Sequence, residues 1–331
     1  MLSAALVAAG CIAAPTAGAV FPGANGKIAV TTEALPPCGD CGPEGGRVWI
    51  MGRRGRIADF AARLVAFSPS GARLAYEDAD YTGVWVARAD GSRRRLLARD
   101  ATYPAWSPRG GLLAFERWTG DLVVALVDGK TRWHPATDGG AGDFAWSPSG
   151  RELALAGELQ VVGFRGRYQR TVFGTGPSSP SVTDVAWSRS GWLSYVRGGR
   201  LEIVRPSGSD ARTLATGVRL SGNDGLTSYL NYSWSPDGQR IAFLRHGGLW
   251  VTRVPGGTPR LLVPADKMGV APQWSPDGRL IAYVRGARPA GHRLLTVPAS
   301  GGEPRTFATF NDRNAGDEYV VDIDWQARPR R

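Results

Sequence analysis

The sequence predicts an all-β fold, a β-propeller of seven four-stranded antiparallel blades closed by the C-terminal strand. Three observations lead to this prediction. An aromatic-Ser-Pro-x-Gly unit recurs about every forty residues, short apolar segments follow each unit, and the two ends of the chain are incomplete repeats that complement each other. If the two ends do not combine, the alternative is a propeller of six blades.

The repeat unit is an aromatic residue followed by a turn. Pro pre-sets φ at the second position of a type I turn and Gly tolerates the exit conformation, so each unit predicts a tight connection between two antiparallel strands. Six instances occur at spacings of 39 to 47 residues. They are Phe67-Ser68-Pro69-Ser70-Gly71, Trp106-Ser107-Pro108-Arg109-Gly110, Trp146-Ser147-Pro148-Ser149-Gly150, Trp187-Ser188-Arg189-Ser190-Gly191, Trp234-Ser235-Pro236-Asp237-Gly238 and Trp274-Ser275-Pro276-Asp277-Gly278.

Three short apolar strands follow each turn. In one repeat they are Ile241-Ala242-Phe243, Leu249-Trp250-Val251 and Arg260-Leu261-Leu262. Together with the strand that ends in the aromatic residue, they give four strands in about forty residues, the size of a propeller blade.

The two ends of the chain supply the parts of one further blade. The segment from Asn25 to Val30 reads as a turn and a second strand, without the aromatic strand that should precede them. The segment from Val320 to Trp325 reads as an aromatic-ending first strand with no blade after it. We therefore expect the last strand to pair with the Ile28 strand, which closes the ring and removes open sheet edges.

These units resemble those of TolB-type propellers, a branch of the Trp-Asp-repeat-like superfamily whose hallmark is Trp-Ser-Pro-Asp-Gly followed by an Ile-Ala-Phe strand. The resemblance covers nearly all of residues 21 to 331 and implies the propeller architecture. The resemblance to TolB implies a periplasmic scaffold of six blades with a separate N-terminal domain. The seven blades expected here leave no room for that domain. Related repeats also form the propeller domains of prolyl oligopeptidase-like peptidases, which carry a hydrolase domain in addition.

The first nineteen residues have the composition of a secretory signal. Met1 to Ala19 is uncharged, rich in Ala, Val and Leu, and ends in a small-x-small pattern. Residues 20–331 then form a single propeller domain. No segment is long enough to predict a transmembrane helix. We expect an exported monomer in the periplasm, the cell envelope or the extracellular space.

Cleavage after Ala19 leaves Cys38 and Cys41, which we expect to form a disulfide in an oxidising compartment. The alternatives are a redox motif, which needs a helix N-terminus, and half of a zinc site, which needs four ligands. Pro and Gly flank this pair, which favours a staple in a small loop.

The chain has a net charge of +11, from 40 Lys and Arg against 29 Asp and Glu. No long basic run with interleaved aromatic residues occurs, so nucleic acid is not an expected partner. An anionic envelope polymer or a protein remains the expected partner.

The sequence gives no sign of an enzyme's catalytic machinery. A Gly-x-Ser-x-Gly nucleophile elbow is missing, and His134, His246 and His292 lie in different repeats. We assign no catalytic residue. Burial between blades explains most of the twelve Trp residues.

Four insertions interrupt the repeat, and all of them fall on one face. Residues 34–46 and 286–293 lie between second and third strands, and residues 217–233 and 309–319 lie between a fourth strand and the next blade. Loops on a rigid scaffold concentrate binding residues, so we interpret this face as functional. The candidate residues are Asn223, Asp224, Tyr229, Asn311, Asp312, Arg313, Asp317 and Glu318.

A second candidate site lies at the channel mouth, three residues before the aromatic position. Asp143, Asp184, Asn231 and Asp322 occupy this position in four of the repeats. First strands line the channel, so these side chains predict a site for a basic group or for a cation, with Ca²⁺ possible at the three Asp residues. The alternative is that each Asp binds its own loop. No other cofactor is expected.

The resulting hypothesis is an exported, non-catalytic binding or scaffold module that contacts a protein or an anionic envelope polymer through the looped face. Two alternatives remain open. One is a propeller-type enzyme, such as a polysaccharide lyase or hydrolase, and the other is a small-ligand sensor that uses the channel mouth.

Overall fold

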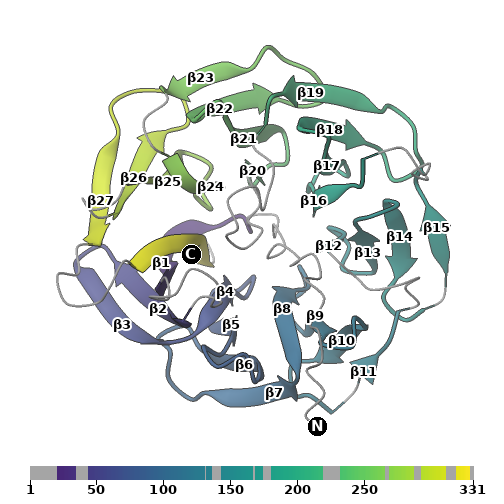
Figure 1. Ribbon diagram of the computed structural model, residues 1–331, viewed down its shortest axis with the longest axis vertical. Helices are drawn as coiled ribbons and strands as arrows, with labels where there is room; N and C mark the ends of the chain where they lie inside the picture. The colour runs from purple at the N-terminus through teal and green to yellow at the C-terminus, as the bar shows by residue number, and fades with distance from the viewer. Residues whose placement is uncertain are drawn as a thin grey trace, which may run out of the picture.

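Seven four-stranded antiparallel sheets are arranged in a ring around a central axis (Figure 1). This computed structural model describes residues 21–34, 44–130, 132–135, 143–166, 168–173, 180–218, 232–264, 268–286, 292–310 and 318–328. The predicted seven-bladed propeller is therefore confirmed, and the six-bladed alternative is excluded. No helix in the described part of the chain is long and apolar enough to cross a bilayer.

Each blade runs from an inner strand beside the axis to an outer strand at the rim. In that order, the first three blades are β28 (Glu318–Arg328), β1 (Ala24–Ala34), β2 (Glu44–Gly52), β3 (Gly55–Ala61); β4 (Arg63–Phe67), β5 (Arg73–Glu77), β6 (Gly83–Arg88), β7 (Arg95–Arg99); and β8 (Ala101–Trp106), β9 (Leu112–Arg117), β10 (Leu122–Leu126), β11 (Arg132–Trp133). The fourth and fifth are β12 (Phe144–Trp146), β13 (Glu152–Leu155), β14 (Gln160–Gly163), β15 (Gln169–Thr171); and β16 (Thr183–Trp187), β17 (Leu193–Arg197), β18 (Arg200–Val204), β19 (Arg212–Thr216). The last two are β20 (Tyr232–Trp234), β21 (Arg240–Arg245), β22 (Gly248–Arg253), β23 (Arg260–Val263); and β24 (Met268–Trp274), β25 (Leu280–Gly286), β26 (His292–Pro298), β27 (Arg305–Phe310).

The antiparallel order gives the ring two different faces. Connections between first and second strands and between third and fourth strands lie on one side, which we call the turn face. Connections between second and third strands and between blades lie on the other side, which we call the mouth face. The four insertions predicted from the sequence join strand ends of the mouth face.

The predicted turn is present at all six aromatic units. In each, the Gly N–H donates to the Ser carbonyl three residues earlier, at 2.7 to 3.0 Å. The Gly φ angles lie between +62° and +83°, a region that L side chains adopt only with strain. The Ser hydroxyl often adds a second bond: Ser235 Oγ accepts the N–H of Arg240 at 2.9 Å, where the second strand begins.

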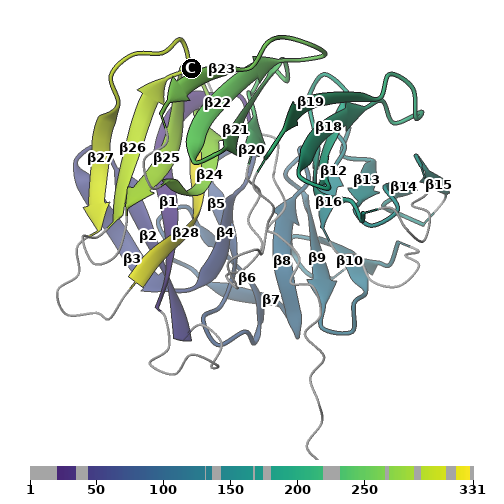
Figure 2. The same cartoon turned by 45° about the horizontal axis from the view of Figure 1, so that its top comes forward.

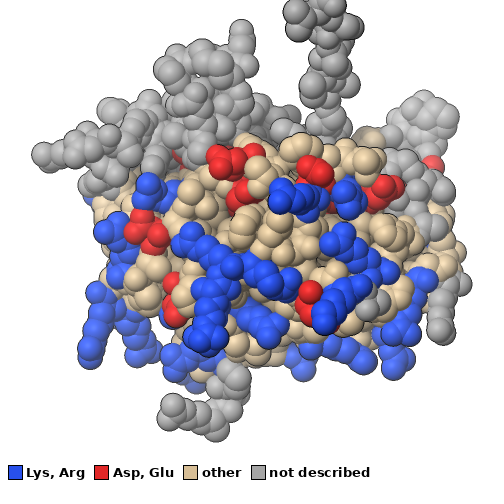
Figure 3. All heavy atoms as spheres, turned by 90° about the horizontal axis from the view of Figure 1, so that it is seen from below, with Lys and Arg blue, Asp and Glu red and all other residues tan. Residues whose placement is uncertain are grey.

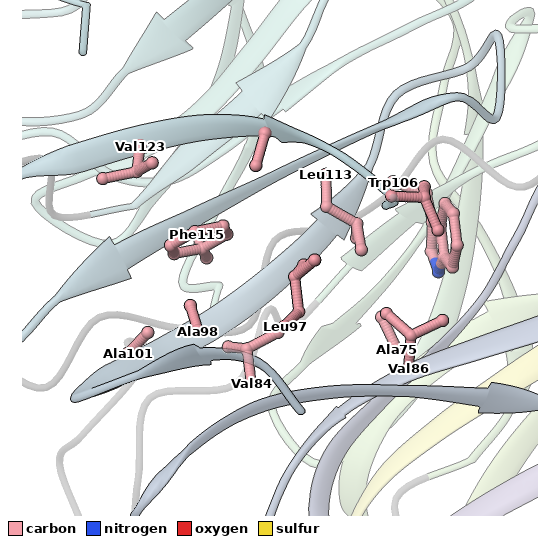
Figure 4. Close-up of a cluster of buried hydrophobic side chains, with 12 residues drawn as sticks. Ala75, Val84, Val86, Leu97, Ala98, Ala101, Trp106, Leu113, Phe115 and Val123 are labelled. Carbon is pink, nitrogen blue, oxygen red and sulfur yellow. The ribbon is translucent and has the colours of Figure 1, made fainter. Parts of the chain in front are cut away.

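Apolar side chains fill the space between neighbouring blades, as Figure 4 shows for the second and third blades. Trp106, Leu113 and Phe115 of the third blade pack against side chains of β6 and β7, and each is at most 4% exposed. The repeat Trp also bonds across the interface, because Trp106 Nε1 donates to the Ala66 carbonyl at 3.1 Å. Trp146 Nε1 repeats this bond one blade further on, to Ala105.

The ring closes as the sequence predicts. β28 pairs with β1 in antiparallel register, with Ile28 opposite Trp325, and Figure 2 shows the C-terminal strand beside β1. Gln326 strengthens the closure, because its Oε1 accepts the Lys27 N–H at 2.8 Å and its Nε2 donates to the Gly71 carbonyl at 2.6 Å. The last strand therefore joins the first blade to the second.

Replacing Trp106 with Phe should cost more stability than the same change at Trp187. Both indoles are almost fully buried, but Trp187 Nε1 has no hydrogen-bond partner among the described residues. The lost Nε1 bond and its orphaned acceptor should make W106F about 1 kcal/mol less stable than W187F in urea unfolding. Equal losses in the two variants would show that the inter-blade bond contributes nothing.

Candidate functional site at the channel mouth

The predicted ring position is a β-bulge in several blades. The register of the first strand against the second shifts between Arg63 and Ala66, Thr102 and Ala105, and Thr183 and Ala186. Inside each shift lies a residue with left-handed φ, at 45° for Leu64, 54° for Tyr103 and 55° for Asp184. Non-glycine residues rarely adopt this conformation, so its recurrence indicates that the β-bulge between the first and second strands imposes it.

Asp143 and Asp184 contact each other. The Asp184 N–H donates to Asp143 Oδ2 at 2.7 Å, and the Asp184 side chain is completely buried, with Thr183 Oγ1 donating to its Oδ2 at 3.0 Å. The Asp184 carbonyl accepts a bond from the Tyr232 hydroxyl of the next blade. The Asp143 carboxylate and the Asp184 backbone therefore link the fourth, fifth and sixth blades.

Asp322 lies in the closing strand and belongs to the first blade, away from Asp143 and Asp184 in the fourth and fifth. Its Oδ1 accepts the Ile323 N–H at 2.8 Å. Burial, and then the charge of Asp324, raises the pKa of Asp322 to about 7. Within the described ranges, no group of three or more His, Cys, Asp or Glu side chains is arranged to hold a metal ion.

The other predicted site residues lie outside the described residues, except for Glu318 at the start of β28, which pairs with Ala34 of β1. Those outside are Cys38, Cys41, Asn223, Asp224, Tyr229, Asn231, Asn311, Asp312, Arg313 and Asp317.

A buried ion pair, not anticipated from the sequence, lies at the mouth between the first and second blades. Arg63 begins β4 and is 3% exposed, and its Nε donates to Glu33 Oε1 at 2.7 Å. Its guanidinium also lies 4.1 Å from the Tyr81 ring centroid. Burial alone would lower the pKa of Arg63, but the charges of Glu33 and Tyr81 outweigh it and the pKa is raised. The Arg63 guanidinium is therefore occupied by its contacts with Glu33 and the Tyr81 ring.

Two further carboxylates at this mouth are less compensated. Glu77 is 2% exposed, and Thr102 Oγ1 donates to its Oε2 at 2.6 Å. Burial raises the pKa of Glu77 to about 7, although the Thr102 bond and the Arg63 charge lower it. Burial and the charge of Asp143 likewise raise the pKa of Glu116 to about 7. In the described part of the chain, neither carboxylate has a Lys, Arg or His nitrogen within 4.0 Å.

Tyr103, the ring residue of the third blade, lies in the electrostatic field of both carboxylates. Burial, followed by the charges of Glu77 and Glu116, raises the pKa of its phenol well above the ordinary value. The sequence held a signal for this cluster. The position after the Leu-Ala-aromatic strand is Glu at 77 and 116, but Ala156, Val196, Leu244 and Val284 elsewhere.

Basic residues predominate on the turn face of the ring, whereas the mouth face carries both signs of charge. Figure 3 shows one side, where Asp and Glu lie mainly toward the upper rim and Lys and Arg cover the wall and the lower rim. Strand ends and turns of the mouth face carry both signs of charge. The acids are Glu33, Glu77, Asp78, Asp80, Asp100, Glu116, Asp121 and Asp143, and the bases are Arg63, Arg99, Arg117, Arg197, Arg200, Arg245, Arg285 and Arg293. Strand ends and turns of the turn face carry fewer acids than bases. The acids are Asp90, Asp128, Glu152, Asp210, Asp237, Asp277 and Glu303, and the bases include Lys27, Arg53, Arg54, Arg73, Arg88, Arg93, Arg94, Arg109, Lys130, Arg151, Arg189, Arg253 and Arg279.

Comparison with known proteins supports the fold alone. No protein-family model and no curated protein matches the chain. Among solved structures, TolB from Acinetobacter baumannii aligns with a TM-score of 0.52 at 14% identity, over 91% of this chain and 83% of TolB. An oligogalacturonate lyase in complex with manganese gives 0.57 at 12% identity, over 86% of each chain. A puromycin hydrolase gives 0.65 at 15% identity, over 93% of this chain and 55% of the hydrolase.

The chain is thus structurally similar to TolB-like and other β-propellers at low sequence identity. Both TolB and enzymes share this fold, so the fold does not determine the function. Any evidence for function therefore has to come from the side chains of the mouth face and the turn face.

Glu77→Gln should stabilise the protein at pH 8 and have little effect at pH 5. The folded pKa near 7 exceeds the unfolded value, so the fold holds a proton that unfolding releases, and stability from this group falls as pH rises toward and past 7. A neutral amide removes that loss, for a gain on the order of 1–3 kcal/mol at pH 8 in urea unfolding.

The exposed Glu158→Gln is the matched control and should follow the wild-type pH profile. An E77Q effect of equal size at pH 5 and pH 8 would rule out titration of Glu77 as the cause.

Proposed function

We propose that this protein is an exported, non-catalytic binding module whose mouth face takes a protein partner through a basic group. The observation that carries the proposal is an exposed Trp beside under-compensated carboxylates. Trp118, in the β9–β10 turn, is 60% exposed, although most Trp residues of the repeat are buried. It lies two residues after Glu116, with Arg117 between them in the sequence. Exposed Trp residues next to charged pockets are typical anchors of protein interfaces.

Carboxylates at the mouth favour a protein partner over an anionic polymer in this proposal. An anionic polymer would be repelled by the partly exposed Glu116 and Asp143. A Lys or Arg of a partner would supply the opposite charge that Glu116 lacks among the described residues, and it would act on the buried Glu77 through its electrostatic field. Such a cation would lower the pKa of both glutamates, so binding should release protons near neutral pH.

The looped-face residues remain proposed contacts of the same partner, because their loops join strand ends of the mouth face. Export rests on residues 1–19, and a disulfide between Cys38 and Cys41 would fit an oxidising compartment.

Titration calorimetry with a tetra-arginine peptide tests the mouth directly. Binding should be measurable at pH 8 and weaker at pH 6, because Glu77 and Glu116 gain protons as the pH falls through 7. The double variant E77Q/E116Q should bind about tenfold more weakly at pH 8, and W118A should lose part of the affinity through the lost cation–π surface.

Two control variants keep this test specific. E158Q removes an exposed carboxylate in the β13–β14 turn of the mouth face, and L261A removes an apolar side chain that is 42% exposed on β23. Both should bind like the wild type. Binding that is indifferent to E77Q/E116Q would reject the mouth as the site. Turnover of a polysaccharide by the mature protein, with Ca²⁺ or Mn²⁺ supplied, would reject the non-catalytic assignment.

A further inference from the structure

A basic groove crosses the junction of the first and seventh blades on the turn face. It has a volume of about 1030 Å³ and is lined by the start of β1, the β2–β3 turn, the β24–β25 turn and the end of β28. Six cations line it: Lys27, Arg53, Arg54, Arg56, Arg279 and Arg328. Asp277 is the one acidic residue in this lining, so the groove is strongly positive.

The Asp277 carboxylate serves its own turn. Its Oδ1 accepts the Ser275 hydroxyl at 2.7 Å and the Arg279 N–H at 3.0 Å. The Asp277 N–H donates to Asn25 Oδ1 at 3.1 Å, which fixes the two sides of the groove to each other. The groove is therefore held in place by the same contacts that close the ring.

Most of the positive charge in the groove has no counter-charge. Arg56 lies over the Trp49 ring at 5.1 Å and has Asp59 at 3.7 Å. Arg53, Arg54, Arg279 and Arg328 are exposed, and among the described residues none of the four has a carboxylate within 4.0 Å. Four guanidinium groups of the groove are thus available to an anionic ligand.

The groove continues into a belt of arginines around the outer wall. An exposed Arg stands at the first or second position of every fourth strand: Arg56, Arg95, Arg132, Arg170, Arg212, Arg260 and Arg305. Some of them also brace the next blade, since Arg95 donates to the Val127 carbonyl and Arg260 to the Ala299 carbonyl at 3.1 Å. A guanidinium has five N–H donors, so each retains donors for a ligand.

We propose that this groove binds a linear anionic glycan, a sugar chain with regularly spaced carboxylate or sulfate groups. Guanidinium groups bind such planar or forked anions through paired hydrogen bonds. The volume exceeds what one anion fills and suits several sugar units. Gly23, Gly26, Gly52 and Gly55 line the groove and lack side chains that would keep a sugar ring out. Ile57, 50% exposed, offers an apolar face for the ring.

Other polyanions fit the groove less well. A single-stranded nucleic acid needs exposed aromatic platforms, and the groove is lined by none. An acidic peptide needs apolar pockets or an open sheet edge, and Ile57 is the one large apolar side chain in the lining. The belt beyond the groove favours a long chain over a small anion, because a chain can engage cations of several blades at once.

The test measures binding of the mature full-length protein to alginate, dextran sulfate, neutral dextran, polyphosphate and a single-stranded oligonucleotide at about 50 mM salt. We expect the affinity for alginate or dextran sulfate to increase with chain length. It should decrease as added salt screens the attraction between the arginines and the glycan. The alginate and dextran sulfate arms distinguish carboxylate from sulfate recognition. Neutral dextran should not bind.

R53Q/R54Q should weaken glycan binding about tenfold, because it removes two exposed charges from the groove and none of the described contacts of the core. The matched control is R99Q/R200Q, which removes the same net charge from exposed positions on the mouth face. This control should bind like the wild type, and thermal unfolding should be unchanged in both double variants.

Equal losses in R53Q/R54Q and R99Q/R200Q would overturn the groove as the site, because binding would then follow net charge alone. Stronger binding of polyphosphate or the oligonucleotide than of either glycan would overturn the ligand class. The inference is independent of the mouth, since E77Q/E116Q should leave glycan binding unchanged.

Discussion

The structure depends on the pairing of β28 with β1. A single blade cannot bury both of its faces, so each blade relies on its neighbours, and a ring with one gap would expose two apolar faces and two blade edges. The last strand removes the gap by completing the first blade, with Trp325 opposite Ile28. The other interfaces repeat one kind of packing, in which large apolar side chains of one blade pack against the sheet of the previous blade.

Closure also decides the chemistry of the mouth. The first strands converge there, and several of their polar groups lose their hydration when the ring closes. Arg63 and Glu33 form a tight pair across the first interface, and Asp143 accepts the Asp184 N–H across another. Glu77 is buried and Glu116 is half-buried in the same region, without an equivalent cation in the described part of the chain. Their raised pKa values follow from that imbalance.

The two faces of the ring differ in the groups that they expose, and we propose that they suit different ligands. The mouth face combines carboxylates with an exposed Trp118, which suits a basic group on a protein partner. The turn face combines a glycine-lined groove with guanidinium groups that have no carboxylate partner among the described residues, and this combination suits a polyanion. One rigid ring could hold both ligands at once, because the two surfaces lie on opposite sides of the sheets.

The sequence by itself determined the blades, their number and their closure. These features are encoded locally, because a turn such as Ser235 to Gly238 needs particular residues at fixed positions. The same motif recurs in each repeat, so each blade is specified in the same way. The tertiary structure decided the burial of Glu77, the partial burial of Glu116 and the left-handed bulges at the mouth. It also decided the groove, where Arg54 and Arg279 come together from opposite ends of the chain. No local pattern could show these, because burial and proximity between distant residues arise only when the ring is closed.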